Sequence, residues 1–352
     1  MKTKALWMLG ALSLGLAGCG GTEALQPEAL GETQQGLGRN TSVTNVIVVS
    51  QNTKMLKLGG WPNFVKCLAD PNCNGAGAVP DIILLQETSD QMAREQILPR
   101  LKLPVSSGGT GITSWAVYAV DGWNSFSEHW HSNAIIYNYD RFTSTGRKAI
   151  QYYTGSGSTV DQPCALRGYY LPFIQLRDEA RARAGYTNNL VSVAVRHDDH
   201  FGYYKFTCPA SNLPSDAEFC DWKNSKLIND NMYSGSLKIM AGDWNYKAKT
   251  CEYNGVTDSS WKYAYRCTTW HIGGCTASEG DLGFTDPRSR QNPAVYDASS
   301  PVDYMHHKYA SSTFLPTTPG NPTPAVLNKT FYGTADSQAW SDHNGLLMRF
   351  SY

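Results

Sequence analysis

The chain has no excess of charge of either sign, because 30 Lys and Arg side chains balance 30 Asp and Glu side chains. Bulk charge therefore neither requires nor excludes a nucleic-acid partner. The chain also lacks a CxxC pair, which argues against a structural zinc site. It has no internal repeat, and no apolar run is long enough to span a bilayer as a stable anchor. These absences argue against repeat proteins, zinc modules and transmembrane proteins.

The first residues are typical of a bacterial export signal. Two lysines precede an apolar run over residues 5–17, which is too short to span a bilayer. The run ends in LAGC at residues 16–19, which matches the lipobox, where cleavage leaves Cys19 as the lipidated first residue. The alternative is an ordinary signal peptide in which this cysteine occurs by chance. Two or three acyl chains hold a protein stably on a membrane, so we expect export and lipid anchoring at the outer membrane or cell surface.

The predicted organisation has three parts, of which residues 1–18 are the lipoprotein signal peptide. Residues 19–43 are rich in Gly, Gln, Thr and Glu, a composition that cannot bury enough surface to offset the entropy of ordering. We expect them to form a flexible tether. Residues 44–352 suffice for one large layered domain, expected to act as a monomer. Removing the two signal-peptide lysines leaves 28 basic and 30 acidic side chains, so the exported chain is close to neutral.

The cysteine count indicates disulfides. The chain has nine cysteines, and eight remain when Cys19 carries lipid. An even number in an exported protein indicates up to four disulfides, whose pairing the sequence does not fix. The short intervening loops favour Cys67 with Cys73 and Cys208 with Cys220.

Short apolar, β-branched runs bounded by turn residues predict buried strands. The runs cover residues 46–50, 81–86, 133–137, 190–195, 237–241 and 345–350. Helices are expected over residues 61–68, 89–98 and 176–184, the second with Ser89 as its cap. The proline-rich residues 311–328 are expected to form a surface loop. The irregular order of strands and helices favours mixed sheets over a purely parallel sheet.

Polar residues follow four of the predicted strands. In layered α/β proteins the carboxyl ends of strands converge on one rim, where ligands bind. Any one of these residues could simply open a loop, but together they predict a single site. They are Asn52, Glu87, His197, Asp243 and Asn245.

These residue types favour metal-assisted attack of water on a phosphate ester. Glu87, with Asn52 and Asp243, offers hard oxygen ligands that suit Mg²⁺, Mn²⁺ or Ca²⁺ and not zinc. Asp243 and Asn245 would orient and deprotonate the water. An imidazolium would donate to the oxyanion or the leaving oxygen.

A second imidazole stands in SDH at residues 341–343, just before the last predicted strand. His343 needs a carboxylate to hold its tautomer and keep it protonated, and Asp303 is available.

The ordered motifs of the chain resemble those of the endonuclease/exonuclease/phosphatase family, which includes DNase-type nucleases and bacterial sphingomyelinases. The resemblance covers about residues 44–352 and implies an α/β four-layer sandwich of two packed mixed β-sheets flanked by helices. Its motifs are QN at 51–52, LQET at 85–88, GDWN at 242–245, VDYM at 302–305 and SDH at 341–343.

The resemblance also implies a role for each residue. Asn52, Glu87 and Asp342 would form the metal site. Asp243 and Asn245 would position the nucleophile.

In the same family pattern, His343 paired with Asp303 would be the general acid or phosphate-binding histidine. The family's second histidine would be His197 or the nearby His200. Arg167 resembles an arginine that some nucleases place on a substrate phosphate.

Three functions are compatible with this pattern. The first is an extracellular nuclease acting on DNA or RNA, favoured by Arg167 and by the exported, disulfide-bearing chain. The second is a phospholipase C of the sphingomyelinase type, which would be expected to expose a hydrophobic hairpin that the sequence does not show. The third is a non-catalytic surface module, which the presence of every core catalytic residue type argues against.

Overall fold

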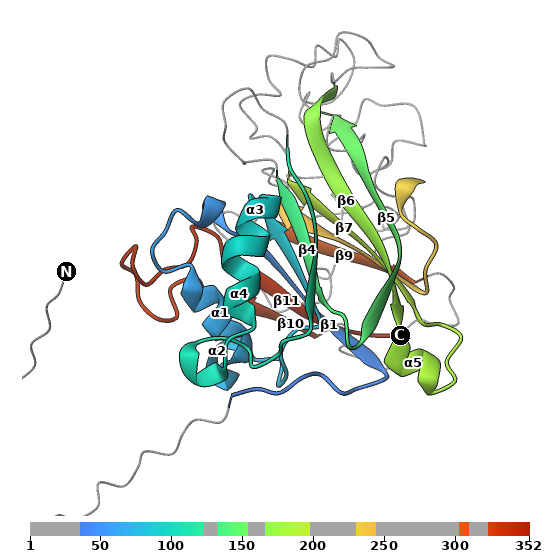
Figure 1. Cartoon of the computed structure of the whole chain (residues 1–352), viewed down its shortest axis with the longest axis horizontal. Helices are drawn as coiled ribbons and strands as arrows, with labels where there is room; N and C mark the ends of the chain where they lie inside the picture. The colour runs from blue at the N-terminus through green and yellow to red at the C-terminus, as the bar shows by residue number, and fades with distance from the viewer. Residues whose placement is uncertain (1–35, 123–131, 154–165, 198–229, 244–302, 310–322) are drawn as a thin grey trace, which may run out of the picture. The chain divides into compact units, whose positions relative to one another are not determined.

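The computed structural model describes residues 36–122, 132–153, 166–197, 230–243, 303–309 and 323–352 (Figure 1). The predicted signal peptide, most of the predicted tether, and the Cys208–Cys220 pair lie outside these ranges. Within them, no helix is long and apolar enough to cross a membrane.

Among the described residues, the first sheet has six strands in the order β10-β11-β1-β2-β4-β3. Strands β1 and β2 run parallel, and all other neighbours in this sheet run antiparallel. Strand β11, close to the C-terminus, therefore lies beside β1 (Figure 1). The bounds are β1 (Asn45–Asn52), β2 (Ile82–Gln86), β3 (Trp115–Val120), β4 (Asn133–Asn138), β10 (Thr323–Leu327) and β11 (Gly345–Ser351).

The second sheet, in the part of the chain that the structure describes, has five strands in chain order, β5 to β9. Strands β7 and β8 run parallel, and the other neighbours run antiparallel. Each sheet thus has a parallel pair near its middle. The bounds are β5 (Phe142–Tyr153), β6 (Leu166–Asp178), β7 (Leu190–His197), β8 (Leu237–Asp243) and β9 (Asp303–Tyr309).

The two sheets share one apolar core, built from alternate positions of their strands. In β7 these positions run from Val191 to Val195, and all of them are buried. Side chains repeat every second residue in a strand, so the next position on the same face is His197. The same alternation leads to Asp243 in β8 and to Asn52 in β1. The register that builds the core therefore also aims polar side chains between the sheets at one end.

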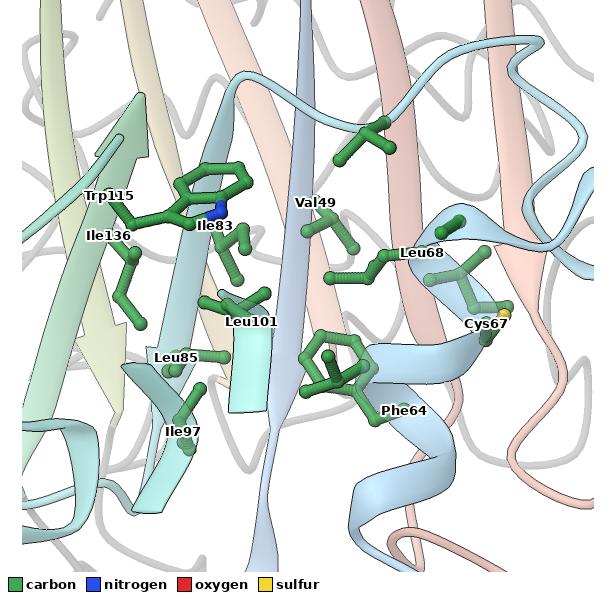
Figure 2. Packing of buried hydrophobic residues seen from close by; sticks show 14 of the residues in the cluster. Val49, Phe64, Cys67, Leu68, Ile83, Leu85, Ile97, Leu101, Trp115 and Ile136 are labelled. Carbon is green, nitrogen blue, oxygen red and sulfur yellow. The ribbon is translucent and has the colours of Figure 1, made fainter. Parts of the chain in front are cut away.

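A second core lies on the outer face of the six-stranded sheet, under a layer of helices. Figure 2 shows Phe64 and Leu68 on one helix and Ile97 and Leu101 on another, facing sheet residues such as Val49. The helices are α1 (Pro62–Ala69), α2 (Pro71–Asn74), and the continuous stretch α3 (Asp90–Met92), η2 (Ala93–Ile97) and α4 (Leu98–Leu101). This arrangement confirms the predicted layered fold of two packed mixed sheets.

The six predicted strands are confirmed, and each is observed within two residues of its predicted bounds. The predicted helices near residues 61–68 and 89–98 are confirmed as well, and the second extends to Leu101. Ser89 caps that helix, because its side chain accepts a hydrogen bond from the Met92 amide at 3.1 Å.

The predicted helix over residues 176–184 is wrong at its start. Leu176 is buried in β6 opposite Val191, and helix α5 covers only Glu179–Arg183. Asp178 sets this boundary, because its carboxylate accepts hydrogen bonds from the backbone of residues 180 and 181. Core burial therefore overrides the helical propensity of this segment.

The loop predicted over residues 311–328 is also wrong at its end, where Thr323–Leu327 form β10. This strand lies at the edge of its sheet. Pro324 is tolerated there because an edge strand pairs on one side only and can lack an amide donor.

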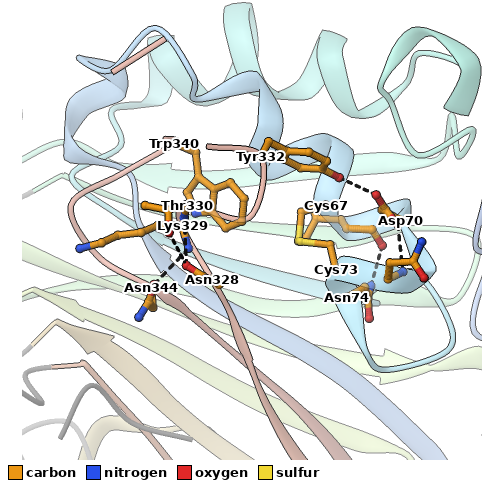
Figure 3. The surroundings of a disulfide bond; sticks show 12 residues. Cys67, Asp70, Cys73, Asn74, Asn328, Lys329, Thr330, Tyr332, Trp340 and Asn344 are labelled. Atoms are coloured by element: carbon orange, nitrogen blue, oxygen red, sulfur yellow. Dashed lines mark hydrogen bonds between the residues drawn. A yellow bond between two sulfur atoms is a disulfide. The ribbon is translucent and has the colours of Figure 1, made fainter. Parts of the chain in front are cut away.

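The predicted Cys67–Cys73 disulfide is confirmed, with a Cα–Cα distance of 5.2 Å. It joins α1 to α2, and Asp70 between them caps α2 through the Asn72 amide (Figure 3). The Tyr332 hydroxyl donates to the same carboxylate at 2.8 Å. The disulfide segment is thereby tied to the chain that precedes β11.

The described end of the predicted tether, residues 36–43, contacts the domain. The Leu37 amide donates to the Ala69 carbonyl at 2.8 Å, and the Asn40 side chain donates to Asp81 at 2.7 Å. The three-part division of the chain remains a prediction.

Candidate active site

Four strand ends bring polar side chains together between the sheets. Asn52 ends β1, Glu87 directly follows β2, His197 ends β7 and Asp243 ends β8. These are the two parallel pairs, one from each sheet, and residues His197 and Asp243 are register partners. The predicted convergence of strand ends therefore occurs, and both sheets contribute to it.

Asn52 is fully buried and links the two sheets. Its amide nitrogen donates to Glu87 Oε1 and to Asp243 Oδ2, both at 2.9 Å. Its amide oxygen accepts from the Lys54 backbone N–H at 2.9 Å. A single amide thus holds two carboxylates close together and lowers the cost of burying their charge.

Glu87, His197 and Asp243 form a candidate metal centre. One potential ligand atom from each lies within 4.8 Å of the others. His197 Nε2 is 3.7 Å from both Glu87 Oε1 and Asp243 Oδ2. Two nearby carboxylates with an imidazole fit a divalent cation, because a cation offsets their buried charge and carboxylate oxygens suit Mg²⁺ and Mn²⁺.

The backbone at Glu87 is strained in a way that serves this centre. Its φ of 53° lies in the left-handed region, which costs a residue with a Cβ about 1–2 kcal/mol. The Thr53 hydroxyl donates to its carbonyl at 3.2 Å, and the Thr88 amide donates to Ser132 at 3.0 Å. These bonds hold the kink by which the chain leaves β2.

The SDH segment brings a second imidazole to Asp243. His343 Nε2 lies 3.6 Å from Asp243 Oδ2 and 3.8 Å from Asp342 Oδ1. The Ser341 hydroxyl donates to the Asn52 carbonyl at 2.7 Å, and the His343 amide donates to Ser341 Oγ at 3.2 Å. The two histidines therefore approach the same carboxylate from different segments, His197 from the end of β7 and His343 from the segment before β11.

Gln51 and Trp340 support the SDH segment. The Trp340 indole donates to Gln51 Oε1 at 3.1 Å, and Gln51 Nε2 donates to the His343 carbonyl at 3.2 Å. Tyr332 stands edge-on to Trp340 and reaches Asp70 beside the disulfide (Figure 3). Burial, together with the Asp70 carboxylate, raises the pKa of Tyr332, so its hydroxyl remains a donor. Support for the site thus extends out to the helical layer.

Lys54 is a functional candidate that the sequence analysis missed. Its ammonium lies 2.9 Å from Asp342 Oδ2, and this hydrogen bond raises the pKa of Lys54. Burial alone would raise the pKa of Asp342, but the hydrogen bond from Lys54 and the charge of His343 outweigh it and lower that pKa. Asp342, predicted as a metal ligand, is therefore already engaged by a cation of the chain.

The segment that carries Lys54 is a left-handed turn, η1 (Lys54–Leu56). Its three residues have φ values of 49°, 54° and 55°, and none is glycine. At about 1–2 kcal/mol for each residue, the turn needs specific support. The Asn52 side chain supplies it at Lys54, and the Leu56 amide donates to the Thr53 carbonyl at 3.0 Å. The side chain of Asn52 thus fixes the backbone that carries Lys54.

The other predicted site residues are placed less fully. The backbone of Asp303 is the register partner of Asp243, but its side chain lies outside the described part of the structure, as does that of Arg167 in β6. Asn245, His200 and Cys19 lie outside the described residues altogether. Of the two candidates for the second histidine, His197 is the one seen at the site.

The chain belongs to the endonuclease/exonuclease/phosphatase family, whose sequence model matches residues 68–343. Members of this family are phosphoester hydrolases that generally use a divalent metal. The predicted resemblance is therefore confirmed. No curated protein matches the chain in sequence.

Solved structures match the chain at low sequence identity. A humanised D. rerio TDP2 is 13% identical, with 88% of this chain and 100% of that chain covered and a TM-score of 0.49. A family protein from Leptotrichia buccalis is 12% identical, with 87% and 100% covered and a TM-score of 0.49. The human Nocturnin catalytic domain is 14% identical, with 88% and 93% covered and a TM-score of 0.48.

Proposed function

We propose that this protein is a divalent-metal-dependent phosphodiesterase, and specifically a nuclease that hydrolyses DNA or RNA outside the cell. The observation that carries the proposal is the meeting of Glu87, His197, Asp243 and His343 around the Asn52 amide. Two carboxylates and two imidazoles at one point are the groups that phosphodiester hydrolysis needs.

The metal would be held by Glu87 and Asp243, with His197 beside them. When bound, it supplies Lewis-acid polarisation of the phosphoryl oxygen. Asp243, whose buried carboxylate lies 3.7 Å from His197 Nε2 and 3.6 Å from His343 Nε2, would orient and deprotonate the attacking water. His343, less buried than Asp243, donates a proton or hydrogen bond to the phosphoryl or leaving oxygen.

Three features support a nucleic-acid substrate over a phospholipid. Arg167, at the start of β6, stands in a sequence context that resembles nucleases with a phosphate-binding arginine. The observed Cys67–Cys73 disulfide suits an exported enzyme. The sequence shows no hydrophobic hairpin of the kind that a sphingomyelinase inserts into a bilayer.

A side-by-side assay tests the proposal. Plasmid DNA, a structured RNA and sphingomyelin vesicles are each incubated with the protein in Mg²⁺ and in chelator. We expect Mg²⁺-dependent cleavage of a nucleic acid. Cleavage of sphingomyelin alone would make the protein a phospholipase C. No turnover of any substrate, or of a bis-nitrophenyl phosphodiester, would make it a non-catalytic module.

We further propose that Cys19 is lipidated and that the protein is anchored to the outer membrane or cell surface. The LAGC motif and the apolar run of residues 5–17 support this location. The variant Cys19→Ser should move the protein from the membrane fraction to the soluble fraction of the source bacterium, as followed by immunoblotting. A variant that still sediments with membranes would contradict the proposal.

A further inference from the structure

Lys54 occupies the exposed rim of the site. Its side chain is 38% exposed and that of its partner Asp342 is 48% exposed, whereas His197 and Asp243 are exposed by 4% and 2%. A ligand that enters from solvent therefore reaches this ion pair before the buried groups. An ion pair so open to water is held weakly, because solvent screens it. Its ammonium is thus available for exchange to another anion.

The position of the Lys54 backbone is fixed relative to the buried centre. Its amide is bonded to the side chain of Asn52, which also holds Glu87 and Asp243. The turn is left-handed over residues 54–56 although it contains no glycine. Such strain persists only where the surroundings enforce it, and it concentrates at functional sites. The fold therefore places a cation at a set distance from the carboxylates.

The negative charge of the site calls for a nearby cation such as the Lys54 ammonium. Glu87, Asp243 and Asp342 bring three carboxylates to a place where an anionic phosphate must bind. Lysine is a compact point charge with three donors, and it is a common phosphate ligand. Exchange of Asp342 for a phosphate oxygen would keep the ammonium paired. The carboxylate of Asp342 would be left to water, since it is 48% exposed, and to His343 at 3.8 Å.

We propose that Lys54 is a substrate-binding residue, whose ammonium leaves Asp342 and donates to a non-bridging oxygen of the substrate phosphate. The inference rests on the proposed function in that the substrate is a phosphodiester. It goes beyond that function because it assigns phosphate recognition to Lys54, which lies outside the family motifs of the sequence.

The test uses the full exported chain loaded with Mg²⁺, with inorganic phosphate as the probe. Binding is measured by titration calorimetry for the wild type, Lys54→Met, Lys54→Arg and the control Lys102→Met. Lys102 is exposed and directly follows α4 in the helical layer, and it makes no contact named for the site. Loss of a charge-assisted hydrogen bond predicts about tenfold or greater weakening in Lys54→Met. Lys54→Arg should bind within about threefold of wild type because it keeps the charge, and the control should be unchanged.

Hydrolysis of the bis-nitrophenyl phosphodiester gives the second reading, in which Lys54→Met should raise KM more than it lowers kcat. Lys54→Asn, which removes the charge but accepts the left-handed backbone, should behave like Lys54→Met and serves if that variant is unstable. Wild-type phosphate affinity in a folded uncharged variant would overturn the inference. If the wild type binds phosphate through Lys54 but hydrolyses no diester, the proposed function fails and the inference stands. If the wild type hydrolyses the diester but binds no phosphate, the inference fails and the proposed function stands.

Discussion

Asn52 shows how one residue organises the site. A side-chain amide has donors at one end and an acceptor at the other, and Asn52 uses both ends. Its nitrogen holds Glu87 and Asp243, and its oxygen holds the turn that carries Lys54. Aspartate at this position would add a third buried carboxylate and remove the donors. The residue therefore has to be an amide of this length, which explains why a polar group is fully buried at a strand end.

His343 is where a structural and a catalytic role predict different results. A histidine that only packs would cost about 1–3 kcal/mol of stability when replaced by alanine, with turnover per folded molecule intact. If His343 acts as a general acid, the His343→Ala variant should turn over substrate about a hundredfold or more slowly than the wild type. The Asp303→Asn variant should lose less of its turnover rate. In the double variant the rate loss should be far smaller than the product of the two single losses, because the Asp303 carboxylate acts only through the His343 ring. Turnover of plasmid DNA or the bis-nitrophenyl diester measures all three. Wild-type rates in His343→Ala would exclude the catalytic role.

Arg141 has a structural role like that of Asn52 at the opposite end of β1 and β2, where it also holds two buried carboxylates. Its guanidinium is buried and bonds to the carboxylates of Asp81 and Asp178, at 3.1 and 2.6 Å. Replacing it with alanine leaves two buried carboxylates without their cation, so Arg141→Ala should lose about 3–5 kcal/mol of unfolding free energy. Arg94→Ala breaks an exposed pair with Asp90 and should lose at most about 0.5 kcal/mol. Urea unfolding compares them, and equal losses would refute the assignment.

At the scale of elements, the strands that build the site were predictable and the turns between them were not. The run 190–195 is apolar except for the buried Ser192 because β7 is buried on both faces, and its polar end at His197 follows directly. Strand β5 (Phe142–Tyr153) escaped prediction because its sequence is polar and broken by Gly146, where the register shifts. It forms a strand because it pairs with β6, and the sequence of β5 alone does not predict that pairing.

The turn η1 escaped prediction for another reason. Nothing in Thr-Lys-Met-Leu favours a left-handed backbone, since glycine and asparagine are the usual residues there. The conformation is imposed by the Asn52 side chain and by bonds that form only in the folded protein. The sequence thus predicts Asn52 and Glu87 as site residues, but no pattern in it places Lys54 beside Asp342.

The strain in this turn is testable at Met55, whose φ is 54°. Met55→Gly removes about 1–2 kcal/mol of strain and adds about 0.5–1 kcal/mol of chain entropy, so stability should stay level or rise slightly. Met92→Gly, at an ordinary helical φ of −58°, should cost about 1 kcal/mol. Met55→Pro cannot reach a positive φ and should abolish turnover. Urea unfolding and diester hydrolysis provide the measurements. A larger loss of unfolding free energy in Met55→Gly than in Met92→Gly would refute the claim that the backbone at Met55 is strained.

At the scale of the whole molecule, the candidate metal centre joins the two sheets. Glu87 belongs to the six-stranded sheet, and His197 and Asp243 belong to the five-stranded one. A cation bound to all three would therefore link residues that the fold otherwise holds through apolar packing and Asn52. Its binding energy adds to the stability of the native state, since the unfolded chain has no such arrangement.

Metal removal should consequently lower the thermal midpoint. At a metal concentration of about 100 times Kd, the native state gains about 2.7 kcal/mol. Chelator should remove this gain in the wild type, and Glu87→Gln should show neither the gain nor metal-dependent turnover, with a nearly unchanged midpoint in chelator. Glu95→Gln, on the exposed side of η2, should behave as wild type. Calorimetric scans with and without Mg²⁺ compare the three, and full activity in Glu87→Gln would remove the metal assignment.

The placement of β11 between β1 and β10 bears on when the enzyme acquires activity during its synthesis. Translation produces residues 45–52 well before their antiparallel neighbours at 345–351. Until then one edge of β1 is open, and the SDH segment that carries His343 does not yet exist. A growing or prematurely ended chain therefore lacks both a closed sheet and the second imidazole. The order of translation thus keeps the hydrolytic site incomplete until the SDH segment and β11 have been made.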